Sequence, residues 1–226
     1  ATYVRLVGRH GRAGVLAWLE AAWFKGAEIR RADAAGQASG AVPPAAVFWP
    51  ECAGLADPAQ LLLQAPRRGL LDGLARRLGE GGKRAADAAD GLRLALQSAD
   101  AETCFLQAWK ALFTQEGEPR RHLGNVPGLD AALDDLRELR RMREQQTAHE
   151  DHGAMLRLTR VLLDEYAALK RRRGLVDMPD LERAAEALLG DGELAGWVQE
   201  RLDQRLRHVL IDEFQDTSPL QWQALQ

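Results

Sequence analysis

Two adjacent carboxylates, Asp212 and Glu213, begin the string Asp-Glu-Phe-Gln-Asp-Thr at residues 212–217. A phosphoryl-transfer site needs a carboxylate to hold Mg²⁺, a hard ion that keeps several water ligands. It also needs a group that positions and deprotonates the attacking water. We assign the metal to Asp212 and the water to Glu213, and Gln215 is placed to sense the terminal phosphate. The string therefore predicts nucleotide hydrolysis that depends on Mg²⁺.

The residues on either side of this string indicate how it is positioned. Residues 208–211 form a short, continuously apolar run, which is typical of a strand buried on both faces of a parallel sheet. Ser218, Pro219 and Gln221 read as the start of a helix. A parallel strand that ends in two carboxylates delivers them into the crevice at the edge of the sheet. An isolated Asp-Glu pair would more often cap a turn, but this context favours the catalytic interpretation.

The rest of the chain is predicted to be mainly helical, because Ala, Leu and Arg are abundant and β-branched runs are scarce. Apolar spacing and turn residues predict short helices at about 58–64, 67–79, 83–98 and 100–114. Residues 31–46 are rich in Ala, Gly and Pro without periodicity, so they are predicted to be a loop or linker. Residues 113–120 are predicted to form a turn in which Gly117 supplies the permissive backbone.

The longest helix is predicted to begin at Thr147, which forms a capping-box pattern with Glu150, and to end at Gly174. Asp177 is then expected to cap a following helix. Its apolar residues are Leu181, Ala184, Ala185 and Leu188. After Gly190 and Gly192, a further helix is predicted. It carries Leu194, Trp197, Val198 and Leu202.

Composition restricts the class of protein. The formal net charge of −3 means that any contact with nucleic acid must come from local basic clusters. Cys52 and Cys104 lie far apart and outside any metal-ligand spacing, so we expect buried, reduced thiols in a reducing compartment. No run reaches the length of a membrane span, and no signal peptide is evident at the start. We therefore expect a soluble, intracellular protein with no membrane partner.

Several other groups have two interpretations. Lys170, Arg171, Arg172 and Arg173 could bind DNA phosphates, or they could simply be a solvated helix end that complements the helix dipole. Residues 137–144 alternate in charge at helical spacing, which favours a salt-bridged exposed face over a nucleic-acid site. His149 and His152 lack an evident third ligand, which argues against a metal site. The six tryptophans are assigned to core packing rather than to base stacking.

The sequence Val-Leu-Ile-Asp-Glu-Phe-Gln-Asp-Thr-Ser-Pro-Leu-Gln at residues 209–221 resembles motif II of the UvrD/Rep helicases of superfamily 1. Upstream residues resemble the pattern Tyr-x-x-x-Lys … Gly-x-x-Asp-Phe-x-Asp-Leu that precedes motif II in that family. These residues are Tyr166, Lys170, Arg173, Gly174, Val176, Asp177, Asp180 and Leu181. Residues 113–120, together with Trp197, Val198, Leu202 and Asp203, are similar to the AddA/RecB-type helicase–nuclease subunits. The resemblance covers about residues 105–226.

The resemblance implies a mainly α fold. Residues 1–176 would form a helical accessory insertion, the domain called 1B in this family. Residues 177–226 would be a returning strand-loop-helix segment of the RecA-like ATPase domain, 1A. The implied function is that of an ATP-dependent DNA helicase and translocase in double-strand-break repair and recombination, in the bacterial cytoplasm. Its cofactors would be ATP and Mg²⁺, and its partners a single-strand/duplex DNA junction and a second helicase–nuclease subunit.

The sequence departs from the family pattern at two places. Met178 and Pro179 stand where the family usually has Phe and a polar residue, which we interpret as a tolerated packing change. No Gly-x-x-x-x-Gly-Lys-Thr phosphate loop occurs in the 226 residues, so we expect this chain alone neither to bind nor to hydrolyse ATP.

Two further expectations follow from the sequence. The strand at 208–211, without its sheet neighbours, is expected to pair with a second copy of the chain or to fold onto the helical body. The alternative function is a non-catalytic helical module that binds DNA or a partner subunit.

Overall fold

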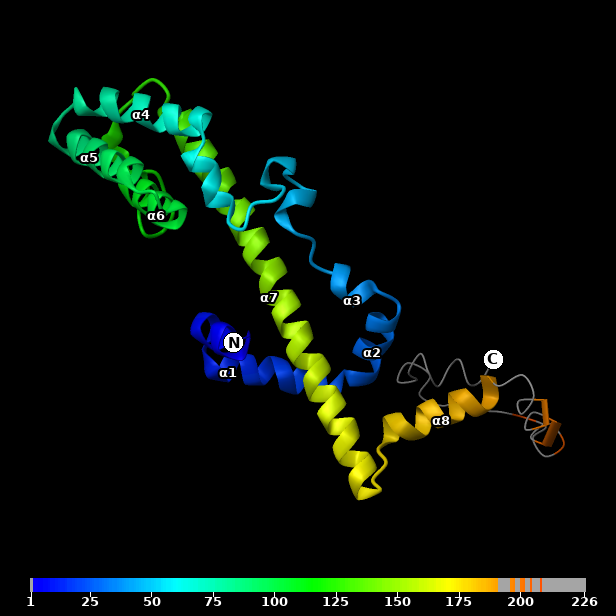
Figure 1. Ribbon diagram of the computed structural model, residues 1–226. Helices are drawn as coiled ribbons and strands as arrows, with labels where there is room; N and C mark the ends of the chain where they lie inside the picture. The colour runs from blue at the N-terminus through cyan, green and yellow to red at the C-terminus, as the bar shows by residue number, and fades with distance from the viewer. Residues whose placement is uncertain (1, 191–195, 198–199, 202–203, 205–207, 209–226) are drawn as a thin grey trace. The chain divides into compact units, whose positions relative to one another are not determined.

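The computed structural model describes residues 2–190, 196–197, 200–201, 204 and 208 (Figure 1). The longer helices are α1 (Thr2–Phe24), α2 (Gly26–Ala34), α4 (Ala65–Gly79), α5 (Lys83–Gln97), α6 (Ala101–Leu112), α7 (Leu129–Arg173) and α8 (Met178–Gly190). Shorter turns of helix are α3 (Gln37–Gly40), η1 (Ala45–Val47), η2 (Pro50–Cys52), η3 (Pro58–Leu63) and η4 (Arg121–Leu123). Within these residues the only β-type pairing is an isolated bridge between Phe113 and Pro119. The predicted mainly α fold is confirmed.

The chain divides into two compact units. The first contains Ala1–Ala17 and Ala32–Leu158, and the second contains Trp18–Arg31 and Thr159–Gln226. Helices α1 and α7 therefore supply residues to both units. The division at 176/177 concerns which domain of a helicase each part belongs to, and it stays a prediction. None of the helices in the described ranges is long and apolar enough to cross a membrane.

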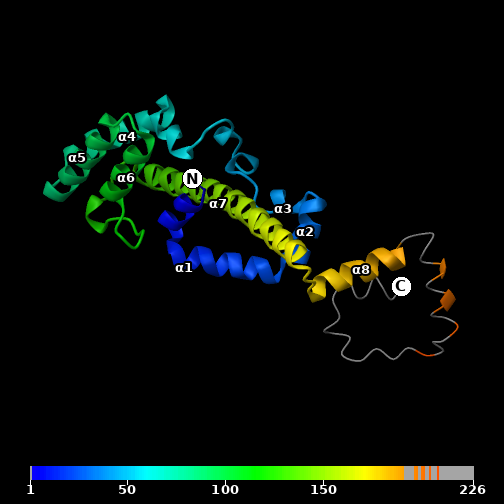
Figure 2. The same cartoon turned by 60° about the horizontal axis from the view of Figure 1, so that its bottom comes forward.

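The core of the first unit is built by α4, α5 and α6, which lie side by side in both views (Figures 1 and 2). Each helix buries apolar residues at a spacing of three or four, as an amphipathic helix must. The buried residues include Leu71, Leu74 and Leu78 of α4, Ala88, Ala89 and Leu92 of α5, and Cys104, Ala108 and Leu112 of α6. The predicted helices at 67–79, 83–98 and 100–114 are therefore confirmed to within two residues, while 58–64 is a 3-10 helix.

Helices α5 and α6 approach each other closely at Gly91 and Ala111. A Cβ atom added at Gly91 would lie 2.9 Å from the Cβ of Ala111, closer than two carbon atoms can pack without a shift. The absence of a side chain at Gly91 therefore sets the distance between the two helices.

The prediction that the longest helix begins at Thr147 is wrong, because α7 begins at Leu129 and runs through Thr147 without a break. The reason is a sustained apolar spacing that the capping-box pattern obscured. Leu133, Leu136, Leu139 and Met142 are all buried against the core. Burying such a stripe stabilises a helix far more than the roughly 1 kcal/mol that a capping residue contributes. The helix ends at Arg173, as expected.

The prediction of a loop or linker over 31–46 is wrong in part, because this segment holds the end of α2, then α3 and the start of η1. Its alanines are good helix formers, and the sequence interpretation gave more weight to Gly and Pro. The predicted turn at 113–120 is confirmed: the amide of Thr114 donates to the carbonyl of Glu118 at 2.8 Å, and Gly117 has φ 84°.

The salt-bridged face predicted at 137–144 is also confirmed. Ion pairs within α7 join Arg137 to Asp134, Arg140 to Glu144 and Arg141 to Glu138.

We predict opposite effects of alanine at two helical glycines. Gly69 of α4 has open space around it, so Gly69→Ala should raise the free energy of unfolding by about 0.5–1 kcal/mol through reduced chain entropy. Gly91→Ala also reduces the entropy of the unfolded chain, but it forces α5 away from Ala111. Overpacking of this kind typically lowers the free energy of unfolding by about 1–3 kcal/mol. Urea unfolding followed by circular dichroism measures both variants, and a Gly91→Ala variant as stable as Gly69→Ala would contradict the close approach.

Candidate functional site

The residues assigned to catalysis and to the metal, Asp212, Glu213 and Gln215, lie outside the described residues. The same holds for positions 209–211 of the predicted strand and for the helix start at Ser218. The part of the site that the structure describes is therefore the corner between α7 and α8, which precedes these residues in the sequence.

The end of α7 is fixed by backbone hydrogen bonds. The amide of Leu175 donates to the carbonyl of Lys170 at 3.0 Å, and the amide of Gly174 donates to the carbonyl of Arg171 at 3.4 Å. Gly174 has φ 62°, a left-handed conformation that glycine adopts without a steric cost. This arrangement is a Schellman motif, which satisfies two carbonyls that the helix itself leaves without partners.

The start of α8 is fixed by two aspartates that cap each other. The amide of Asp180 donates to Asp177 Oδ1 at 3.1 Å, and the amide of Asp177 donates to Asp180 Oδ2 at 3.2 Å. The exchange is that of a capping box, with an aspartate in the position that Glu or Gln usually occupies. Two negative charges at a helix N-terminus also interact favourably with the helix dipole. The predicted capping role of Asp177 is confirmed.

Lys170 joins the two helix ends. Its Nζ atom lies 2.8 Å from Asp177 Oδ2 and 2.6 Å from Asp180 Oδ2. The hydroxyl of Tyr166 donates to the same Asp177 Oδ2 at 3.2 Å, and the Lys170 ammonium lies 4.9 Å from the centre of the Tyr166 ring. Only 9% of Lys170 is exposed to solvent. These four residues, Tyr166, Lys170, Asp177 and Asp180, form what we call the corner cluster.

The electrostatics of the corner cluster favour the charged forms of Lys170 and Asp180. The hydrogen bond from Lys170 lowers the pKa of Asp180 to about 2, against the opposing effect of partial burial. Partial burial by itself would lower the pKa of Lys170, but its hydrogen bonds to Asp177 and Asp180 raise it above the ordinary value. Arg183 adds a further ion pair to Asp180. Lys170 and Asp180 therefore form an ion pair at neutral pH.

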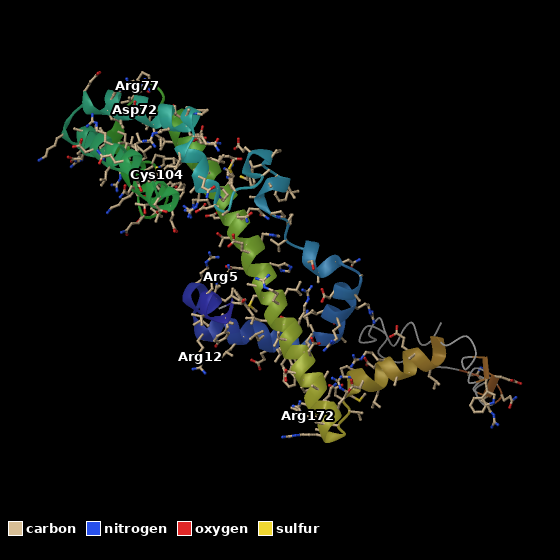
Figure 3. All side chains as sticks on the ribbon, viewed as in Figure 1. Arg5, Arg12, Asp72, Arg77, Cys104 and Arg172 are labelled. Atoms are coloured by element: carbon tan, nitrogen blue, oxygen red, sulfur yellow. The ribbon has the colours of Figure 1, made fainter. Side chains whose placement is uncertain are left out.

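The basic residues at 170–173 do not act as one group. Lys170 is occupied by two carboxylates, whereas Arg171, Arg172 and Arg173 are exposed. Figure 3 shows Arg172 projecting from the last turn of α7. No ion pair to these three arginines occurs among the described residues. A contact with DNA phosphates therefore stays a prediction for the three arginines, and Lys170 has a structural partner instead.

A small cavity of about 70 Å³ lies beside the corner cluster in the same unit. Trp23, Leu163, Tyr166 and Lys170 are among the residues that line it. Trp23 packs edge-on against Tyr166 with ring centres 5.5 Å apart. This volume is well below the roughly 300–1,000 Å³ of typical small-molecule sites.

Other candidates from the sequence have structural roles. His149 Nδ1 donates to the carbonyl of Val42, and His152 Nε2 donates to that of Ala38, each at 2.7 Å. In the part of the chain that the structure describes, no cluster of three His, Cys, Asp or Glu residues could hold a metal ion. Cys52 and Cys104 are buried free thiols, as predicted, and burial raises the pKa of each.

Trp109 is partly buried and packs against the core of the first unit. It stacks on Phe113 with ring centres 3.9 Å apart, and the Arg140 guanidinium lies 4.9 Å from the centre of the Trp109 ring. The assignment of this tryptophan to packing is confirmed. Trp18, Trp23 and Trp197, by contrast, are each more than 40% exposed.

Sequence reasoning named every member of the corner cluster in a family pattern but not the contacts among them. It treated Lys170 as one of four similar cations. The available signal was the spacing of seven and ten residues from Lys170 to the two aspartates across a glycine, which places a helix end and a helix start next to each other.

The low pKa of Asp180 predicts how stability depends on pH. A carboxyl group whose pKa is lower in the folded protein contributes stability above its unfolded value, near 3.8, and loses it as the pH falls towards 2. The free energy of unfolding should therefore fall between about pH 4 and pH 2, and Asp180→Asn should make this fall smaller. Urea unfolding at a series of pH values measures it. Glu165→Gln removes an exposed carboxylate of α7 and serves as the control, and an equal effect of the two variants would contradict the prediction.

The family model described as UvrD/REP helicase N-terminal domain matches residues 89–226, more than half of the chain. Similar curated proteins include the RecBCD enzyme subunit RecB of Mycolicibacterium smegmatis, 42% identical over 72 residues, which are 31% of this chain and 6% of that protein. The A subunit of the ATP-dependent helicase/nuclease of Lysinibacillus sphaericus is 38% identical over 78 residues, covering 33% of this chain and 6% of that protein. The protein of the same name from Latilactobacillus sakei is 29% identical over 155 residues, covering 57% and 17%.

No solved structure matches the chain. The chain spans only about 6% of the length of the first two of these relatives, so their activities are not transferred to it directly. The family match nevertheless includes α6, α7, the corner cluster and the string at 212–217. The chain belongs to the UvrD/Rep helicase family.

Proposed function

We propose that this chain is part of an ATP-dependent DNA helicase and translocase that acts in DNA repair and recombination. The observation that carries the proposal is the string at 212–217 inside the matched range 89–226. The similar proteins are named as the A subunit of an ATP-dependent helicase/nuclease and as RecB of the RecBCD enzyme, which supports the same class. These names also support a nuclease activity in the whole protein and a second subunit, which would be its partner.

The proposed chemistry divides between two carboxylates. Asp212 would hold Mg²⁺ through water, since this ion keeps much of its hydration shell. Glu213 would orient and deprotonate the water that attacks the terminal phosphate of ATP, and Gln215 would contact that phosphate. The Gly-x-x-x-x-Gly-Lys-Thr loop that holds the other phosphates does not occur in these 226 residues, so the chain alone is expected to be inactive.

The corner cluster would serve this site by position rather than by contact. Lys170 ties the last turn of α7 to the first turn of α8 through two carboxylates. The chain that continues towards Asp212 therefore leaves from a fixed helix start. Glu and Asp groups that act on water must be held to within a fraction of an ångström, which favours rigid elements on either side of them.

Arg171, Arg172 and Arg173 are the proposed phosphate contacts of this part of the chain. They are exposed, adjacent and directly next to the corner cluster. If DNA binding shifted the last turn of α7, the shift would also move Lys170, which fixes the start of α8.

A non-catalytic role is the second candidate. The described residues form helices without a nucleotide-sized cavity next to the corner cluster, which is compatible with a module that binds DNA or a partner subunit. Dependence of ATP turnover on Glu213 in the whole protein separates the two.

We predict that Glu213→Gln in the whole protein lowers ATP turnover by about 10²-fold or more and leaves ATP binding nearly unchanged, because it removes the base and keeps the shape. Steady-state phosphate release and equilibrium nucleotide binding measure the two effects. Glu165→Gln, at an exposed position of α7, is the matched control and should behave like the unmodified protein. If the Glu213→Gln protein retained more than about a tenth of the rate, Glu213 would not be the base.

We also predict weak, salt-dependent DNA binding by the 226-residue chain that partly depends on the end of α7. Arg171→Gln combined with Arg172→Gln should lower the slope of log affinity against log salt by about 0.7 for each lost contact with a single strand. Fluorescence anisotropy with a 20-nucleotide strand measures the slope. The control pair is Arg140→Gln with Arg141→Gln, two adjacent arginines of the same helix that are ion-paired. Equal slopes for both pairs would exclude the end of α7.

A further inference from the structure

A groove between α5 and α6 carries a second positive surface, in the first unit and separate from the end of α7. Its volume is about 550 Å³, and its charged lining is Arg84, Asp87, Lys110, Arg120 and His122. We propose that this groove binds the sugar-phosphate backbone of nucleic acid without contacting the bases. The choice of nucleic acid as the anion rests on the proposed function. The location of the binding site and its preference for an anion rest on the groove itself.

Small residues make the floor of the groove. Gly91 of α5 and Ala111 of α6 both line it, and a Cβ atom added at Gly91 would lie 2.9 Å from the Cβ of Ala111. Because neither residue fills the space above the contact, a shallow channel remains along the two helices. Backbones can approach surfaces of this kind without a side chain in the way.

The charge around the floor is positive and available. Arg84, Lys110 and Arg120 make no ion pair among the described residues, and Asp87 is the only carboxylate in the lining. Two other arginines of this unit are ion-paired, by contrast: Arg76 with Asp72, and Arg93 with Asp90. Three cations and one carboxylate leave a net charge of about +2 at neutral pH with His122 neutral, which favours a polyanion.

Arg84 lies in the first turn of α5, a position where a positive charge destabilises a helix. It follows Lys83 in the first turn of α5, a turn that holds no acidic residue. The positive end of the helix dipole repels cations there and attracts anions, by about 0.3–1 kcal/mol for each charge. Helix formation alone therefore gives no reason for a basic first turn, whereas the binding of an anion between the helix end and Arg84 does.

Arg120 is held in place before any ligand arrives. Its Nε and Nη2 atoms both donate to the carbonyl of Lys110 at 3.1 Å, and its own amide donates to the carbonyl of Leu112 at 2.9 Å. A guanidinium has five N–H donors, so three remain for a ligand. A fixed guanidinium loses little entropy when it binds a phosphate, and its planar fork matches two phosphate oxygens.

The groove offers no platform for stacked bases. The only ring in its lining is the imidazole of His122. Single-strand binding proteins usually gain roughly 1–3 kcal/mol from each stacked base. Without such rings, recognition is limited to phosphates and sugars, and the base sequence should have no effect.

The test compares two double variants of the 226-residue chain by fluorescence anisotropy. The probes are a 20-nucleotide strand of thymidine and an abasic strand of the same length. Arg84→Gln with Lys110→Gln removes two groove cations and should weaken binding about fivefold or more at low salt. It should also lower the salt slope by about 1.4, at roughly 0.7 for each contact. The abasic strand should bind the unmodified chain within about twofold of the thymidine strand, since stacking does not contribute.

The matched control is Arg5→Gln with Arg12→Gln, which also removes two positive charges but outside the groove. Arg5 and Arg12 are exposed residues of α1, and both are labelled in Figure 3. Glutamine is nearly as good a helix former as Arg and Lys, so circular dichroism should show the same helix content for all variants. A further variant, Arg120→Lys, keeps the charge and loses the fork, and it should weaken binding with an unchanged salt slope.

Three results would overturn the proposal: equal binding by the groove variant and its control, much weaker binding of the abasic strand, or equal competition by a polyglutamate of the same charge. The last result would mean that the groove binds anions in general. None of these depends on ATP turnover, so a failure here leaves the proposed helicase function untouched. Conversely, an unchanged rate for Glu213→Gln in the whole protein would leave the groove untouched.

Discussion

One side of α7 carries an apolar stripe, made of Leu133, Leu136, Leu139 and Met142. This stripe is buried only because α4, α5, α6 and the chain around them cover it. A helix of this length has no apolar face that continues along all of its turns, so different elements must cover successive stretches. In the first unit, α4–α6 cover the start of α7. In the second unit, Leu163 packs against Gly26 at a spacing that a Cβ atom would prevent.

After the apolar stripe, polar side chains of α7 form hydrogen bonds to the segments packed against it. Gln145, His149 and His152 donate to the carbonyls of Pro43, Val42 and Ala38, each at 2.7 Å. Asp151, which is 8% exposed, accepts hydrogen bonds from Arg9 and His10 of α1. Carbonyls and carboxylates that are partly removed from water need such donors, because an unpaired buried polar group costs roughly 1–3 kcal/mol. The residues between α2 and η1 are therefore ordered by hydrogen bonds rather than by a hydrophobic core.

Local periodicity predicted α4, α5 and α6 well, because each buries one stripe against its sequence neighbours, and Gly117 with its neighbouring turn residues predicted the turn at 113–120. The start of α7 could not be predicted in the same way. The capping-box pattern of Thr147 and Glu150 is a local signal, and it is overridden by leucines that share one core with residues far earlier in the chain. The same limit applies to the candidate site. The Asp-Glu string and its family were recognisable from residue order alone, while the pairing of Lys170 with Asp177 and Asp180 depends on a glycine turn that reverses the chain.

The two roles of Lys170 fix the number of residues that can connect α7 to α8. Its carbonyl accepts from Leu175 to end α7, and its ammonium binds the two aspartates that begin α8. One inserted or deleted residue between positions 170 and 177 would move the start of α8 relative to the end of α7, so the backbone and side-chain contacts could not both survive. Insertions should therefore accumulate in connections such as residues 98–100 or 124–127, and homologous chains should keep the six-residue interval between Lys170 and Asp177 even where the residues inside it change.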